Sequence, residues 1–152
     1  MAALGLGRPA VIASKYPHLM PEDRAIWRRY LEIGRYVPDE VWYDVRVGVG
    51  VEVPSGAPVW LDKFAEYATR KRIDIVGRYG EAFAVIECKP RAGMVALGQA
   101  LFYGWAFERE YAPGLQVLAG IFTDNADPDV APVIRDSGIW LVEVGLAEGV
   151  ID

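Results

Sequence analysis

Cysteine and histidine are almost absent from this chain of 152 residues. A single cysteine, Cys88, excludes an internal disulfide, and a single histidine, His18, leaves too few ligands for a typical zinc or iron–sulfur site. Zinc chemistry is therefore poorly supported. Neither a Ser-His-Asp constellation nor a phosphate-binding glycine loop is visible. The groups that remain for catalysis are carboxylates, lysines and arginines.

Long hydrophobic runs and an excess of positive charge are also missing. No apolar run reaches the roughly 18 residues of a membrane span, and the start of the chain lacks the basic segment of a signal peptide. The net charge of −5 argues against a protein that coats nucleic acid, but it is compatible with a local basic patch. Because 53% of the residues are hydrophobic, the chain can bury a sizeable core. We expect one domain over residues 21–152, preceded by an irregular arm over residues 1–20. We expect the protein to be cytoplasmic, with no membrane association.

Periodicity along the chain alternates between helix and strand. Helical spacing follows Pro21 and stops at Gly34, whereas valine-rich and β-branched runs indicate strands. The expected elements after the first helix are a strand over 41–53, a short helix over 60–71, a hairpin over 72–89 that ends before Pro90, a largely buried helix over 93–111, a strand over 115–123, a helix within 124–138 and a strand over 139–145. This order predicts an α/β fold with a central mixed sheet of four to five strands flanked by helices.

The stretch RIDIVGRYGEAFAVIECK, residues 72–89, predicts a hairpin with a two-residue turn at Gly80-Glu81. If the residues flanking the turn pair with each other, counting outward places Asp74 opposite Glu87. Directly opposed residues have Cβ atoms about 4.5–5.5 Å apart on one face of the sheet. The hairpin is therefore expected to bring two carboxylates together inside otherwise apolar strands.

Lys89 lies two residues beyond Glu87 and shares its face of the strand. Opposed carboxylates repel each other, and a hard divalent cation such as Mg²⁺ (or Mn²⁺) removes that repulsion. Lys89 can then orient or deprotonate a water molecule or stabilise developing negative charge. These groups predict a site that hydrolyses phosphodiesters. A solvated ion-pair cluster is the simpler interpretation, and the apolar neighbours of both acids argue against it.

The pattern of Asp74 followed by Glu87-Cys88-Lys89 resembles the motif of the PD-(D/E)xK nuclease superfamily, with Ile73 where the motif has proline. The resemblance implies a restriction-endonuclease-like core. It also implies that Asp74, Glu87 and the backbone carbonyl of Cys88 bind the metal, and that Lys89 assists the attacking water. The Cys88 side chain alternates to the other face, where a small buried residue is expected.

Gln99 and Tyr103, on the predicted helix 93–111, resemble the Q-x-x-x-Y motif of the RecB-like branch of this superfamily. They are four residues apart and share a helix face, so a place beside the catalytic groups and ordinary core packing are both open. Many members also place an acidic ligand upstream. The candidates here are Glu32, Glu40, Glu52 and Glu66. His18 matches the upstream histidine of the branch only weakly, and an arm or surface position is the simpler interpretation.

Basic residues near the motif can contact the phosphates of DNA. They are Lys63, Arg70, Lys71, Arg72 and Arg91. A solvated helix face is an equally good interpretation for several of them. Aromatic residues suit either base stacking or core packing, with core packing favoured for most. They are Trp27, Tyr30, Trp42, Tyr43 and Trp60.

Together these features predict a divalent-metal-dependent DNA nuclease that acts as a homodimer or with partner proteins. Single-domain relatives such as archaeal Holliday junction resolvases work in this way, and the small size suggests a phage or mobile-element enzyme of recombination or repair, located in the host cytoplasm. Junctions, flaps and ends are compatible substrates, and endonuclease and exonuclease action are both open. The alternative is a non-catalytic structural or partner-binding module of a phage or repair assembly on the same fold. Binding of Mn²⁺ through Asp74 and Glu87 would discriminate between the two.

Overall fold

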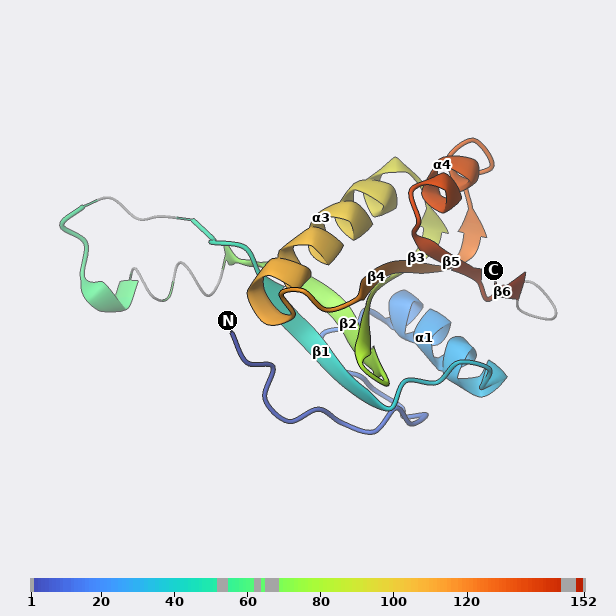
Figure 1. Ribbon diagram of the computed structural model, residues 1–152, viewed down its shortest axis with the longest axis horizontal. Helices are drawn as coiled ribbons and strands as arrows, with labels where there is room; N and C mark the ends of the chain where they lie inside the picture. The colour runs from blue at the N-terminus through green and yellow to red at the C-terminus, as the bar shows by residue number, and fades with distance from the viewer. Residues whose placement is uncertain (1, 52–54, 62–63, 65–68, 146–149, 152) are drawn as a thin grey trace.

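The computed structural model describes residues 2–51, 55–61, 64, 69–145 and 150–151 (Figure 1). Its elements are α1 (Pro21–Ile33), β1 (Glu40–Val47), β2 (Lys71–Tyr79), β3 (Ala82–Ala92), α3 (Met94–Tyr111), β4 (Val117–Ala126), α4 (Ala131–Asp136), β5 (Trp140–Glu143) and β6 (Val150–Ile151). The strands form one sheet in the order β1-β2-β3-β4-β5-β6. Pairing is antiparallel from β1 to β3, parallel from β3 to β5 and antiparallel between β5 and β6. The predicted α/β fold with a mixed, helix-flanked sheet is confirmed, and the two-residue β6 is an addition to it.

Helices cover both faces of this sheet (Figure 1). On one face, α1 buries Ile26, Trp27 and Tyr30 against β3 and β4. The N-terminal arm adds Tyr16 and Leu19 to the same core cluster, so it belongs to the folded unit although it has little regular structure. On the other face, α3 packs on β3 and β4, and α4 packs on β5. The sheet is therefore a buried layer whose edges and strand ends remain available for a site.

Two predicted boundaries are wrong for local reasons. The first strand ends at Val47 instead of continuing to residue 53, because Gly48 has φ 82° and leaves the extended conformation. The third strand runs past Pro90 to Ala92. Beyond Ile86 this strand is paired with β4 and not with β2. Pro90 has no N–H to donate, and it is tolerated here because one side of the strand is unpaired, as on an edge strand.

The prediction that the helix over 93–111 is largely buried is also wrong. One face of α3 packs on the sheet, but Met94, Val95, Leu101 and Trp105 on its outer face are between 50% and 78% exposed. The expected helix over 60–71 falls partly outside the described residues. Of its positions, 60, 61, 64 and 69 are described and helical, and β2 begins at Lys71. Within the described part of the chain, no helix has the length and apolarity needed to cross a membrane.

Candidate active site

The β2–β3 hairpin has the predicted register up to the point where the two acids meet. Tyr79 pairs with Ala82, and the ladder continues to Ile75 and Ile86. The next positions along the same register are Asp74 and Glu87, and there the backbone ladder has ended. Side chains now bridge the strands, because the Asp74 N–H lies 3.4 Å from Glu87 Oε1 and the Cys88 N–H lies 3.4 Å from Asp74 Oδ2. The strands therefore separate where the carboxylates lie.

Burial and mutual repulsion dominate the electrostatics of this carboxylate pair. Glu87 is only 2% exposed. Burial raises the pKa of Glu87 well above its usual range, and the negative charge of Asp74 raises it further. Burial also raises the pKa of Asp74. Both bridging hydrogen bonds are longer than the usual 2.7–3.2 Å, so the backbone donors compensate this charge only weakly. The pair is thus short of positive charge.

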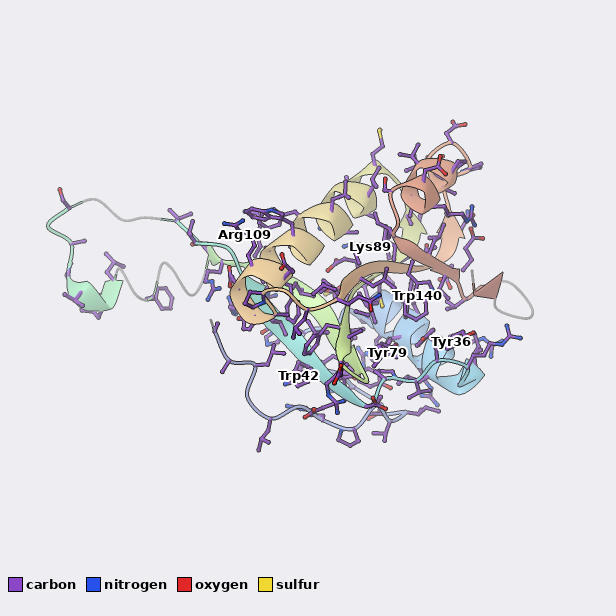
Figure 2. All side chains as sticks on the ribbon, in the orientation of Figure 1. Tyr36, Trp42, Tyr79, Lys89, Arg109 and Trp140 are labelled. Atoms are coloured by element: carbon purple, nitrogen blue, oxygen red, sulfur yellow. The ribbon has the colours of Figure 1, made fainter. Side chains whose placement is uncertain are left out.

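Lys89 is the cation that acts on both carboxylates. Its charge lowers the pKa of Asp74 and of Glu87 against the larger effect of burial. It follows Glu87 by two residues on β3, and it lies between α3 and the sheet in Figure 2. The structure therefore brings Asp74, Glu87 and Lys89 together, as the hairpin geometry predicted.

Cys88 contributes its backbone rather than its side chain. The side chain is fully buried in the core cluster under α1, and burial raises the pKa of the thiol well above its usual range, which disfavours a nucleophilic thiolate. The prediction of a small buried residue is confirmed. In a strand, the N–H and C=O of one residue point toward the same neighbour. Because the Cys88 N–H approaches Asp74, its carbonyl is expected to face the same opening.

A third acid, Asp23, acts electrostatically on this site and was missed from the sequence. It lies in the first turn of α1. Its negative charge raises the pKa of Asp74, and the positive charge of Lys89 lowers the pKa of Asp23 against burial. The sequence signal was an acid two residues after Pro21, which is explained equally well by the helix dipole.

Of the four candidate upstream acids, the two that the structure describes, Glu32 and Glu40, do not take this place. Glu32 pairs with Arg28 at 3.1 Å near the other end of α1. Glu40 accepts a hydrogen bond from the Gly7 N–H, and it begins β1 beside the turn end of the hairpin. Glu52 and Glu66 fall outside the described residues.

Helix α3 covers the carboxylate face of the hairpin. Tyr103 is 8% exposed, and the charges of Glu87 and Asp74 add to burial in raising the pKa of its hydroxyl. One turn earlier, the buried Oε1 of Gln99 has no hydrogen-bond partner among the described residues. Gln99 and Tyr103 share a helix face, so this amide oxygen is expected to lie near the site. For Tyr103 the charge effects favour the place beside the two acids, and for Gln99 both interpretations stay open.

The expected phosphate-contacting residues have different surroundings. Arg91 and Lys89 line a hollow of about 360 Å³ at the start of α3. Lys71 lies 5.6 Å from the centre of the Phe102 ring. Arg72 pairs with Asp44 at 3.2 Å and lines a small cavity with Asp74.

Arg70 is held by structural contacts. Its guanidinium contacts Glu110 at 2.7 Å and donates to the Gly48 carbonyl at 2.7 Å, so it ties the end of β1 to α3. His18, expected in the arm, pairs with Asp44 at 3.1 Å. Lys63 is outside the described residues.

The donor set fits a hard divalent cation in part. Among the described residues, no three histidine, cysteine, aspartate or glutamate side chains gather into a complete ligand group. Two carboxylates that lack compensating charge, together with the Cys88 carbonyl, are nevertheless oxygen donors of the kind Mg²⁺ takes, since Mg²⁺ binds one or two carboxylates and fills its other positions with water or phosphate.

Comparison of the chain with protein-family models, with curated proteins and with solved structures finds no match.

Proposed function

We propose that the protein is a divalent-metal-dependent nuclease with a restriction-endonuclease-like core. One observation carries this proposal: the β2–β3 ladder ends before Asp74 and Glu87, and these two poorly compensated carboxylates are buried together where the charge of Lys89 acts on both. A purely structural hairpin would gain from apolar residues at these positions, because burying like charges costs folding free energy. The arrangement instead suits a cation and a phosphodiester.

Asp74, Glu87 and the Cys88 carbonyl would hold Mg²⁺ or Mn²⁺. The bound cation would supply Lewis-acid activation of water and neutralise charge on the phosphate. Asp23 adds negative charge on the α1 side, which strengthens the attraction for a cation. Gln99 and Tyr103 limit the site on the α3 side, and their polar atoms can orient water or a phosphate oxygen.

Lys89 carries the proton-transfer or charge-stabilising role. Its charge acts on both carboxylates, so its amine could position the attacking water and offset negative charge that develops on the phosphate. The start of α3 supports phosphate binding next to it. This helix has no acidic residue in its first turn, so its dipole and free N–H groups favour an anion near Lys89 and Arg91.

The test is cleavage of labelled four-way-junction, duplex, flap and single-stranded DNA with Mg²⁺, Mn²⁺ or EDTA. We expect metal-dependent cleavage by the wild type and a loss of more than about 100-fold in Glu87→Gln and Lys89→Ala, since even the partners of metal ligands contribute 10–100-fold. Glu81→Gln is the matched control, because Glu81 is an exposed acid at the turn of the same hairpin.

Circular dichroism spectra and melting curves of all variants ensure that a loss of cleavage is not a loss of folding. Cleavage that persists in EDTA, or that survives unchanged in Glu87→Gln, contradicts the proposal. The preferred DNA structure would identify the type of nuclease.

A second candidate function is a non-catalytic, partner-binding module. The outer face of α3 favours it, since Met94, Leu101 and Trp105 form an exposed apolar stripe at helical spacing. Light scattering over a range of concentrations tests for a self-associated form, and isothermal titration with Mn²⁺ separates the two functions. A module without catalysis is expected to bind no Mn²⁺ through Asp74 and Glu87.

A further inference from the structure

A polar groove runs along β1 on the side of the N-terminal arm. It has a volume of about 510 Å³, and its walls include Arg8, His18, Trp42, Arg46 and Arg70. The arm forms one wall because Arg8 and Val41 exchange backbone hydrogen bonds of 2.8 Å in an isolated β-bridge. Figure 1 shows the N-terminal segment alongside β1. The groove is therefore a built feature of the fold.

Basic side chains dominate the groove in a protein whose net charge is −5. Asp44 is the shared carboxylate, with His18 at 3.1 Å, Arg72 at 3.2 Å and Arg46 at 3.9 Å. Two arginines and a histidine thus gather around this one carboxylate. Arg8 adds a further positive charge from the arm, where its side chain is exposed and its charge lowers the pKa of the Tyr43 hydroxyl.

The backbone at Asp44 connects this groove to the candidate active site. Asp44 has φ 57°, a conformation that is uncommon outside glycine and that interrupts the β1–β2 ladder opposite Asp74. A small cavity lined by His18, Asp44, Arg72 and Asp74 lies at this interruption. His18 and Asp44 line both cavities, so the groove adjoins the small cavity beside Asp74.

We infer that this groove binds a single strand of nucleic acid that leaves the Asp74–Glu87 pair along β1. A basic groove with an aromatic wall is the usual site for such a strand, because the cations track phosphates and rings accept bases. Trp42, which is partly exposed on β1, is the ring suited to stacking (Figure 2).

The proposal that the groove binds a single strand depends only on the groove. The proposal that this strand is a substrate rests on the proposed nuclease function. If both hold, the enzyme is expected to prefer DNA with a single-stranded segment, such as a flap or a splayed end, over an intact duplex.

Fluorescence anisotropy with labelled single-stranded and duplex 12-mers in EDTA tests the groove without cleavage. The variants are Arg8→Gln on the groove wall and Arg72→Gln in the adjoining small cavity. Arg29→Gln is the control because Arg29 is an exposed arginine on α1 whose loss changes the net charge equally. Arg8→Gln leaves the backbone bridge to Val41 in place, and melting curves confirm folding. We expect each groove variant to weaken single-strand binding several-fold and to reduce the slope of log K against log salt by about 0.7, the value for one phosphate contact.

The groove proposal fails if Arg8→Gln, Arg72→Gln and Arg29→Gln have the same affinity for the single strand. It also fails if the duplex binds as tightly as the single strand. Cleavage assays on the same variants keep the two proposals apart. If the groove variants cleave DNA and bind single strands as tightly as the wild type, the nuclease proposal stands and the groove proposal fails. If the groove variants selectively lose single-strand binding and the wild type cuts no DNA, the groove proposal stands and the nuclease proposal fails.

Discussion

The two ends of the β2–β3 hairpin differ in what their side chains do. At the turn end, Tyr79 pairs with Ala82, its hydroxyl lies 3.3 Å from that of Tyr30, and its ring meets the edge of Trp140 (Figure 2). At the open end, the ladder stops, and Asp74 and Glu87 are buried together. The turn end gains stability from aromatic packing, whereas the open end keeps charge at a cost in folding free energy. A single hairpin thus combines a stabilising end with one that buries charge.

The largest expected effect on stability comes from disrupting the aromatic packing at the turn end of the hairpin. Phe122 on β4 is fully buried, with ring centroids 4.3 Å from Tyr30 and 5.0 Å from Trp140. Phe122→Ala is expected to lower the free energy of unfolding by about 3–5 kcal/mol, because it removes a buried ring and leaves a cavity. Urea unfolding followed by circular dichroism measures this loss. Leu118→Ala, at an exposed position of the same strand, is the control and should cost far less.

The next effect sharpens the contrast at the open end. Mn²⁺ at 100 times its dissociation constant is expected to stabilise the wild type by about 2.7 kcal/mol, because it binds the folded protein and not the unfolded chain. Glu87→Gln should lose this stabilisation, and Glu81→Gln should retain it. Thermal melts with Mn²⁺ or EDTA provide the measurement. Equal stabilisation of all three proteins would place the cation elsewhere.

A pH dependence follows from the raised pKa values of Asp74 and Glu87. A carboxyl with a higher pKa in the folded state contributes stability below its unfolded pKa, and this contribution is lost as the pH rises through the folded pKa. Without metal, the wild type is therefore expected to lose stability as the pH rises above about 4, the usual carboxyl value. The slope is at most about 1.4 kcal/mol per pH unit for each carboxyl.

Glu87→Gln removes one of these titrations, so its stability should fall less steeply. Urea unfolding of both proteins in EDTA between pH 4 and pH 8 measures the difference. Titrations elsewhere affect both proteins alike and cancel. A stability difference that is constant over this range would mean that Glu87 does not titrate with a raised pKa.

The smallest effect compares neighbouring positions of one strand. Ile86 is fully buried and paired with Ile75 in the last rung of the ladder, whereas Glu87 follows beyond it. Ile86→Val is expected to destabilise the protein by about 0.5–1.5 kcal/mol, the usual cost of one buried methylene. Glu87→Gln at neutral pH without metal should be neutral or stabilising, since it removes a buried like charge. Urea unfolding of both variants under one condition measures the change in the free energy of unfolding. A larger loss of stability in Glu87→Gln than in Ile86→Val would contradict the comparison.

Much of the site was predictable because its parts are local in sequence. The turn at Gly80-Glu81 and the alternation along the two strands place Asp74, Glu87 and Lys89 together. Asp23 was not predictable in this way, because an acid at a helix start has a local explanation, and its approach to Lys89 depends on how α1 packs across the sheet.

The amino-acid sequence by itself determined the order of helices and strands, the hairpin register and the shared face of the two acids and the lysine. These features follow from periodicity and turn chemistry, which act over a few residues. Only the tertiary structure decided that the strands separate at Asp74, that the arm closes a groove beside β1 and that the outer face of α3 stays exposed. These features depend on contacts between segments far apart in the chain, which residue patterns within one segment do not encode.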